Sequence, residues 1–314
     1  MERSRKDFIF GSLGLATAGV LAGCRTTATP PPAAVAGEDM LDLWQRETDQ
    51  VTADVFEAYL RGEVPATDYV SLTRLEEGFD KVLCEIDAAD VSAHPAVWMV
   101  YNMGVIVKTR ESLFSIDLMH RRAEELAPRL DFALITHNHG DHYQTEFYRA
   151  MNGAKKTVIN NFIDNYGAAD WKKGGAKWFE NGGFTRATKV FKIRDVEIRT
   201  SLVDHNNYLI DFTTAFEIRV GDWILYHTGD CGVASKLRTI WGRPDLWVFF
   251  PGCGVNVADA ERNVRPKQMA FGHLWELGHR TGRLTTPMVR AAQKKAIDAG
   301  EKNLTVPLWG ERIV

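Results

Sequence analysis

The sequence of 314 residues lacks the features of several common protein classes. It has no excess of basic residues, since 38 lysines and arginines stand against 41 acidic residues and the formal net charge is −3. This balance argues against a nucleic-acid-binding protein. The four cysteines include no C-x-x-C pair, so a structural zinc site made of cysteines alone is not expected. A hydrophobic content of 45% with 25% charged residues is ordinary for a globular protein with a sizeable core.

No apolar run is long enough for a comfortable membrane-spanning helix, which needs about 20 residues. The best candidate, Phe8 to Leu21, follows a basic start, as in an export signal. It ends in LAGC, residues 21–24, which resembles the lipobox of bacterial lipoproteins. That resemblance implies cleavage before Cys24, lipidation of its thiol, and a body anchored to a bacterial membrane that faces the periplasm or the cell surface. An uncleaved N-terminal anchor is the alternative.

We divide the chain into four segments. Residues 1–23 are the predicted signal peptide, and residues 24–37 are the lipidated cysteine and a Pro-rich tether, RTTATPPPAAVAG, whose prolines favour an extended chain. Residues 38–90 are predicted to be helical because apolar residues recur at spacings of three and four. We interpret these apolar stripes as packing surfaces rather than a binding groove. Residues 91–314 are the main domain.

The main domain alternates short apolar, β-branched and aromatic runs with polar breaks, which predicts strands. Helices are expected around residues 120–127 and 288–299. Alternation of strands and helices is typical of an α/β fold. Strands are expected at 97–109, 112–118, 130–136, 157–160, 189–203, 214–220, 223–227, 246–250 and 304–308.

A predicted buried strand runs directly into HNHGDH, residues 137–142. His137 and His139 are two apart in an extended segment, so both side chains can point the same way. Gly140 is expected to allow a sharp turn that directs the next two side chains toward a neighbouring ion. Imidazole and carboxylate suit zinc, or manganese or iron, whereas a polar surface loop would not need three of the chain's nine histidines. The candidate ligands of this motif are His137, His139, Asp141 and His142.

This motif, with the order of later candidates, resembles the metallo-β-lactamase superfamily. The chain offers His205 after a strand, Asp230 at the end of a further strand, and His273 toward the C-terminus. The resemblance implies a four-layer αββα sandwich, here with an N-terminal helical extension. It also implies two divalent metal ions, with zinc favoured and manganese or iron as alternatives. By the resemblance, the first ion is held by His137, His139 and His205, the second by Asp141, His142 and His273, and Asp230 bridges them.

The remaining histidines are assigned by their sequence neighbours. His279 competes with His273 as the last ligand, and we favour His273 because it follows a strand-like sequence. His227 is interpreted as a core or supporting residue, and His94 and His120 as surface residues.

Several other polar residues keep two interpretations. Asp117 either orients a ligand histidine or caps a turn. Asn102 and Glu276 either contact substrate or pack within loops. An oxidising compartment permits a disulfide, and a Cys231–Cys253 bridge near the pocket is an open alternative.

The resemblance implies a metal-dependent hydrolase that acts on a small-molecule substrate. Paired ions lower the pKa of bound water from about 15.7 to about 7, and the hydroxide attacks a carbonyl or phosphoryl centre, with Asp141 orienting the nucleophile and returning a proton to the leaving group. The spacing of the motifs looks most like the ascorbate-6-phosphate lactonase branch, which implies a lactone or other ester-like, sugar-derived substrate. Since one fold hosts many reactions, a metal-dependent phosphodiesterase and a non-catalytic lipid-anchored binding protein remain alternatives.

Overall fold

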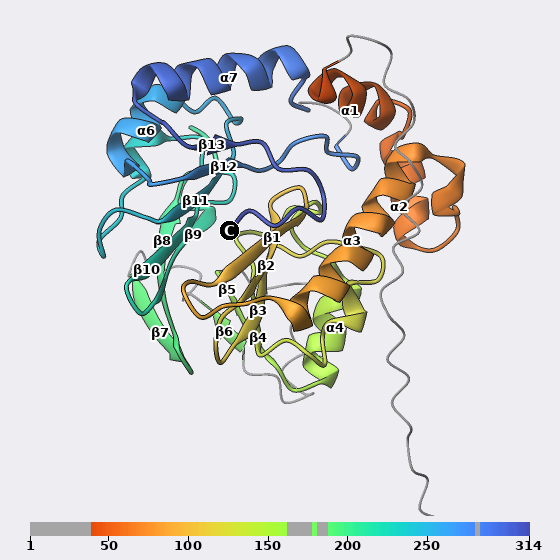
Figure 1. Ribbon diagram of the computed structural model, residues 1–314, viewed down its shortest axis with the longest axis horizontal. Coiled ribbons are helices and arrows are strands. Elements are labelled where there is room, and N and C mark those ends of the chain that lie inside the picture. The colour runs from red at the N-terminus through yellow and green to blue at the C-terminus, as the bar shows by residue number, and fades with distance from the viewer. Residues whose placement is uncertain (1–38, 162–177, 181–187, 280–282) are drawn as a thin grey trace, which may run out of the picture.

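A computed structural model describes residues 39–161, 178–180, 188–279 and 283–314. The predicted signal peptide, the tether and Cys24 lie outside these residues. Two mixed β-sheets pack face to face, and helices cover their outer faces (Figure 1). The expected four-layer α/β sandwich is therefore confirmed. In the part of the chain that the structure describes, no helix has both the length and the apolar character to cross a membrane.

The first sheet has six strands in the order β1-β2-β3-β4-β5-β6. Its first three strands form an antiparallel meander, and β3 to β6 run parallel. All six residues of β1 are buried, as expected for a strand covered on both faces. The strands are β1 (Ala96–Tyr101), β2 (Gly104–Lys108), β3 (Leu113–Ile116), β4 (Phe132–Leu134), β5 (Thr157–Asn160) and β6 (Trp178–Glu180).

The second sheet has seven strands in the order β13-β12-β11-β10-β9-β8-β7. Strands β10 to β13 are parallel, and β7 to β10 are antiparallel. Consequently β8, β10, β11 and β12 all end at the same edge of the sheet. The strands are β7 (Lys189–Ile193), β8 (Val196–Val203), β9 (Thr213–Val220), β10 (Trp223–His227), β11 (Leu246–Phe249), β12 (Met269–Phe271) and β13 (Leu304–Thr305).

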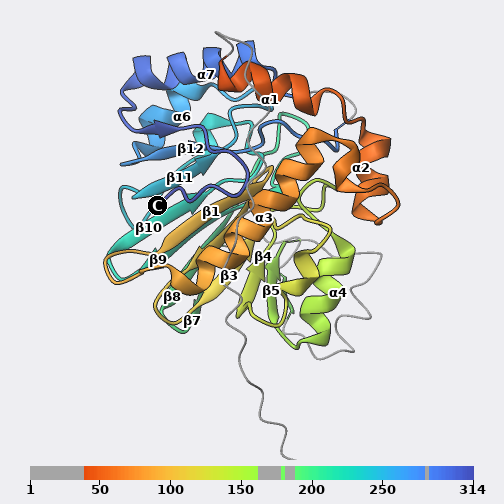
Figure 2. The same cartoon turned by 45° about the vertical axis from the view of Figure 1, so that its right-hand side comes forward.

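The helices lie on both outer faces of the sandwich (Figure 2). Helices α6 and α7 cover the seven-stranded sheet, whereas α3 and α4 cover the six-stranded sheet. The helices are α1 (Met40–Thr48), α2 (Ala53–Leu60), α3 (Val70–Ala88), α4 (Thr145–Gly153), α6 (Val257–Val264) and α7 (Thr286–Ala299), with short 3₁₀ turns η1 (Ala66–Asp68), η2 (Ala123–Glu125) and η3 (Ala234–Lys236).

The N-terminal segment is helical, as predicted, but its first apolar stripe is divided between two helices. Thr52 accepts a hydrogen bond from the backbone N–H of Val55 and so caps the start of α2. Helix α1 joins the two outer layers, because Arg74 of α3 pairs with its Glu47, and Thr286 of α7 donates its backbone N–H to its Gln45. The extension is thus packed onto the sandwich rather than separate from it.

The C-terminal segment returns to the six-stranded sheet. The backbone N–H of Ile313 donates to Val97 of β1 at 2.7 Å. Gly310 lies directly against Gly78 of α3, where a Cβ on either glycine would come within 3 Å of the other segment's backbone. This close approach fixes the chain end between α3 and β1.

Several local predictions are wrong. The helix expected at 120–127 is only the turn η2, and the strand expected at 189–203 is a hairpin that turns at Arg194, whose φ is 53°. His120 is buried rather than exposed, and its ring stacks on Phe79 of α3 at 4.0 Å. The residues next to His120 in the sequence do not indicate this burial, because Phe79 lies on a helix that is distant in the sequence.

Candidate metal centre

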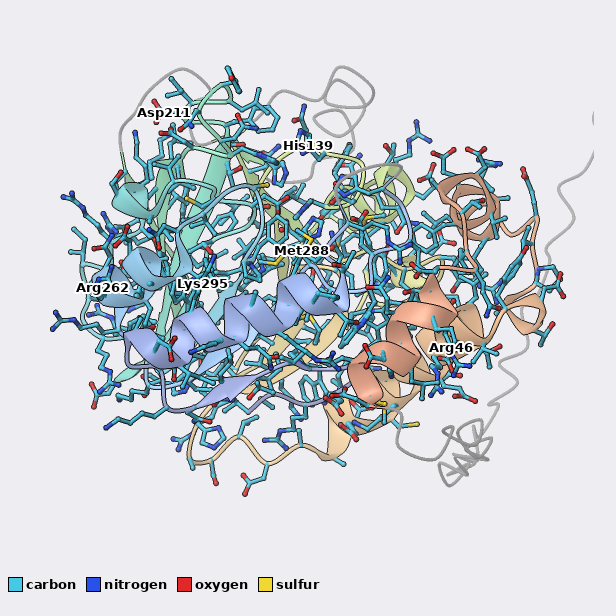
Figure 3. The ribbon with its side chains drawn as sticks, turned by 90° about the horizontal axis from the view of Figure 1, so that it is seen from above. Arg46, His139, Asp211, Arg262, Met288 and Lys295 are labelled. Atoms are coloured by element: carbon cyan, nitrogen blue, oxygen red, sulfur yellow. The ribbon has the colours of Figure 1, made fainter. Side chains whose placement is uncertain are left out.

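The candidate ligands meet at the edge where several strands end. The sequence HNHGDH follows β4, His205 follows β8, Asp230 follows β10, and His273 follows β12. Figure 3 shows His139 on the same side of the molecule as Asp211, which belongs to the loop between β8 and β9. The sheets therefore bring side chains from distant parts of the sequence to one place.

The first group contains His137, His139 and His205, whose candidate ligand atoms all lie within 4.8 Å of one another. Nε2 of His137 is 3.1 Å from Nδ1 of His139. The ring of Phe212 lies beside His139, with 5.0 Å between the ring centroids. Three imidazoles are a suitable ligand set for zinc, and the Phe212 ring is an apolar surface beside them.

The second group contains Asp141, His142, Asp230 and His273, also within 4.8 Å. Nε2 of His273 lies 2.9 Å from Oδ2 of Asp141 and 3.3 Å from Oδ2 of Asp230. Oδ1 of Asp230 lies 3.2 Å from Nε2 of His142. The same aspartate lies 3.6 Å from His205 of the first group, so it occupies the position between the two groups.

Buried polar atoms in this cluster have no hydrogen-bond partner of normal geometry among the residues that the structure describes. They are Nε2 of His142, Nε2 of His205 and Oδ1 of Asp230. Leaving such atoms unsatisfied costs about 1–3 kcal/mol each, and buried polar groups are rarely left so. Divalent cations held by the two groups would satisfy all three atoms, so the residues present fit a metal.

Metal binding needs neutral imidazoles and ionised carboxylates, and His137 and Asp230 are already in these states. Burial and the neighbouring His142 lower the pKa of His137 well below its usual value, which keeps its ring neutral. Burial alone would raise the pKa of Asp230, but His142 and His273 together hold it well below the usual range. The rings of His142 and His273 are not neutral: against the effect of burial, Asp230 and Asp141 raise the pKa of His142 well above its usual value and that of His273 to about 10, so a metal ion would displace a proton from each ring.

Asp117, at the end of β3, supports the cluster from behind. Its Oδ2 lies 2.9 Å from Nδ1 of His142, which leaves Nε2 facing the metal position. Carboxylates often hold ligand histidines in this way. The proposed orienting contact is therefore present, and Asp117 also accepts hydrogen bonds from the backbone and hydroxyl of Thr136.

The loops that carry the ligands are held by close backbone contacts. Gly229, just before Asp230, has a φ of 49°, and a Cβ there would lie 2.8 Å from Thr136 and Thr213 side chains. The backbone oxygen of Asn102, in the β1–β2 turn, accepts a hydrogen bond from the backbone N–H of His273, and the side-chain amide of Asn102 donates to Asp141. Asn102 thus serves both as a turn residue and as a site residue.

Gly140 lies in the expected turn, where the backbone N–H of His142 donates to the carbonyl oxygen of His139, but the turn does not require a glycine. Its φ is not positive, and a Cβ would meet nothing within 4 Å. The tight approach of Asp141 and His142 to the other ligands is achieved without a conformation that only glycine adopts.

His279 forms a further group of candidate ligand atoms with Asp141, His273 and Glu276, all within 4.8 Å of one another, but it lies farther from Asp141 than His273 does. Its Nε2 is 3.8 Å from Oδ2 of Asp141, farther than the 2.9 Å of His273. Its Nδ1 contacts the carboxylate of Glu276, a side chain that is only 1% exposed. These distances favour His273 as the last ligand of the second group. His279 faces a pocket, and its Nδ1 contacts Glu276.

The two cysteines near the site do not form the disulfide considered above, since Cys231 and Cys253 are both free thiols. Burial raises the pKa of the Cys231 thiol to about 12. Cys253 has its Sγ 3.6 Å from Nδ1 of His205, a contact that the sequence did not indicate. His227 is a core residue, as expected, with its Nε2 2.9 Å from the Met103 carbonyl oxygen.

A pocket of about 350 Å³ opens beside the centre. Its lining includes His139, Asp141 and His279 together with Phe56 and Leu60 of α2. This volume is near the lower end of the range for small-molecule sites, about 300–1,000 Å³.

The fold matches many solved structures, although no family model and no curated protein sequence matches the chain. Igni18, a metallo hydrolase from Ignicoccus hospitalis, is 16% identical, covers 70% of this chain and 97% of its own, and gives a TM-score of 0.52. The metallo-β-lactamase fold protein YhfI from Bacillus subtilis is 14% identical, with 69% and 98% covered and a TM-score of 0.51. CmlA, a diiron β-hydroxylase from Streptomyces venezuelae, is 15% identical, with 68% and 53% covered and a TM-score of 0.52.

These likenesses identify a chain with the metallo-β-lactamase fold. Sequence identities of this size establish the architecture and not the reaction. The similar structures themselves catalyse different reactions, since Igni18 is a metallo hydrolase and CmlA is a hydroxylase. The function must therefore be argued from this chain's own site.

Proposed function

We propose that the protein is a metal-dependent hydrolase of the metallo-β-lactamase superfamily that binds two divalent ions. The observation that carries the proposal is the pair of ligand groups joined by Asp230, with unpaired buried atoms of His142, His205 and Asp230 between them. The proposed ligands are His137, His139 and His205 for one ion, Asp141, His142 and His273 for the other, and Asp230 for both.

Two ions at such a site polarise a substrate oxygen and acidify water, so that a nucleophile is available at neutral pH. The protein's own contribution begins with Asp141, which is 7% exposed and lines the pocket. Asn102 holds this carboxylate through its side-chain amide at 3.2 Å from Oδ2. Asp141 is thus placed to orient the attacking water and to pass its proton to the leaving group.

A lactone or other small ester is the proposed substrate class, with zinc as the favoured metal and manganese or iron as alternatives. The limited pocket volume supports a small substrate. None of the described residues that line the pocket is a lysine or arginine, so a charged group beyond the reach of the ions would find no such partner among them. A lipid anchor at Cys24 would place this activity outside the cytoplasm, and labelling of the wild type but not of Cys24→Ser with a radiolabelled fatty acid tests that part.

The proposed reaction is tested by comparing the wild type with Asp141→Ala after reconstitution with zinc or manganese. The panel contains sugar lactones, homoserine lactones, a phosphodiester and a β-lactam. We expect lactone turnover in the wild type, its abolition by a chelator, and a loss of at least 100-fold in the variant with an unchanged circular dichroism spectrum. Full activity of Asp141→Ala would contradict the assigned role, and turnover of the phosphodiester alone would replace the lactone proposal.

A further inference from the structure

The N-terminal helical segment contributes directly to the pocket beside the metal centre. Phe56 and Leu60 of α2 line the same pocket as His139 and Asp141. The sandwich begins only at β1, so α2 is an addition to the fold that reaches the site. Figure 2 shows α2 at the end of the sandwich, outside its layers.

The apolar wall is firmly packed. Phe56 is 2% exposed, and its ring lies 5.1 Å from that of Tyr101 and 5.9 Å from that of Tyr59. Met119 is equally buried and adds to the same pocket. A Cβ on Gly278 would lie 3.5 Å from the Phe56 ring, so the loop that carries His279 rests against α2. The distance between the apolar wall and the metal centre is therefore set by packing.

The polar part of the pocket lining is also held in place by contacts within the protein. Glu276 is buried and contacts Nδ1 of His279, which holds the half-buried ring with Nε2 toward Asp141 and the pocket. Nε2 is thus available for a hydrogen bond to a polar substrate atom. A substrate in this pocket meets both polar atoms and carbon.

The charges around the pocket favour an uncharged ligand. Glu57 is exposed at its rim, and Asp141 lies at its base. Within residues 39–161, 178–180, 188–279 and 283–314, no lysine or arginine lines the pocket. A phosphate or carboxylate group that lies beyond the reach of the metal ions would find no lysine or arginine partner among these residues and would lie near the Glu57 carboxylate.

We propose that this pocket is the specificity site of the enzyme and binds a short, uncharged alkyl or acyl chain attached to the ester that reacts at the metal centre. Helix α2, through Phe56 and Leu60, sets the length of that chain. The inference rests on the proposed hydrolase function, and it narrows the substrate from sugar-derived lactones to neutral lactones or esters with an apolar substituent.

The test is a series of γ-lactones offered to the full-length, zinc-loaded protein: γ-butyrolactone without a side chain, γ-octalactone with a butyl chain and γ-decalactone with a hexyl chain. Each methylene that is buried should raise kcat/KM about fourfold until the pocket is full. The measured quantity is the ratio of kcat/KM for γ-decalactone to that for γ-butyrolactone.

Leu60→Trp fills the pocket from the α2 side, and we expect this ratio to fall at least tenfold. Leu60→Ala lengthens the pocket and should move the preference toward longer chains, so the proposal stays testable if the bulky variant does not fold. Leu83→Trp is the matched control, because Leu83 is a half-buried leucine of α3 that does not line the pocket. An equal ratio in the wild type and both Leu60 variants would overturn the inference.

A second readout does not depend on turnover. Saturation-transfer NMR with hexan-1-ol, a neutral probe that cannot be hydrolysed, should show binding to the wild type and to Leu83→Trp, and a loss of at least fivefold in affinity for Leu60→Trp. If hexan-1-ol binds in this way but no lactone or ester is turned over, the pocket assignment stands and the proposed hydrolase function fails. If lactones are turned over but hexan-1-ol binds equally to all variants, the pocket assignment fails alone.

Discussion

The carboxylate of Asp117 lies 2.9 Å from Nδ1 of His142, and neither side chain has any exposed surface. The same carboxylate accepts hydrogen bonds at 2.7 Å from the backbone N–H and the hydroxyl of Thr136. That hydroxyl in turn lies 2.9 Å from Nδ1 of His137. One buried aspartate therefore positions a histidine in each of the two ligand groups.

We predict that Asp117→Asn weakens metal binding about 10- to 100-fold. Oδ1 of Asp117 accepts from the backbone N–H of Thr136 and Oδ2 accepts from Nδ1 of His142, whereas asparagine has only one acceptor oxygen, so one of these contacts and with it the orientation of His142 is lost. Competition with a chromophoric chelator measures the affinity. Asp131→Asn is the control, since Asp131 also accepts a backbone N–H, from Leu113 at 2.9 Å, but lies away from the cluster. Equal affinities for the wild type and Asp117→Asn would show that the contact does not support a ligand.

His120 should make the stability of the fold depend on pH. Burial, together with Arg122 and Arg121, lowers its pKa from 6.5 to about 3, so the unfolded chain binds a proton more readily than the folded one. The associated stability is present above pH 6.5 and is lost as the pH falls toward 3. Between pH 7 and pH 5 we expect a loss of about 2 kcal/mol in the free energy of unfolding from this residue.

His120→Phe removes the titrating group while keeping a ring against Phe79, so its urea-unfolding free energy should fall less steeply between pH 7 and pH 5 than that of the wild type. His94→Phe, at an exposed histidine, should follow the wild-type slope. A His120→Phe protein with the wild-type slope would show that His120 is not buried in its neutral form.

Gly78→Ala should destabilise the protein by about 1–3 kcal/mol, the usual cost of overpacking. A Cβ at this position of α3 would lie 2.8 Å from the backbone oxygen of Trp309, and the C-terminal segment would have to move away from β1. Gly153→Ala, at the end of α4 with nothing within 4 Å of its Cβ, should instead be neutral or stabilise by up to about 1 kcal/mol. Urea denaturation of both variants measures the difference, and an equal effect of the two substitutions would contradict the packing at Gly78.

The sequence predicts the parts of the site that follow one another along the chain or follow an apolar strand. His137 to His142 are contiguous, and Asp230 follows β10, so their common location depends only on strands ending at one edge. The resemblance also predicts that His273 lies near Asp141, and the two side chains are 2.9 Å apart. The choice between His273 and His279 needed distances, because both lie in one short loop.

The remaining features depend on contacts between distant segments, which periodicity does not encode. The contact of Cys253 with His205 and the burial of His120 under α3 are of this kind. The apolar stripe of α2 predicts only a packing surface. The tertiary structure is needed to place Leu60 in the same pocket as His139. The free thiols of Cys231 and Cys253 likewise could not be inferred from their positions after strand ends.

The most direct measurement is the metal content of the full-length protein, determined by elemental mass spectrometry after loading with zinc or manganese and dialysis. In the proposed site, seven side chains hold two ions and Asp230 contacts both. We therefore expect two ions per chain in the wild type and fewer than one in Asp230→Ala, with the circular dichroism spectrum unchanged. A wild type that retains no metal, or an Asp230→Ala variant that retains two ions, would contradict this proposal.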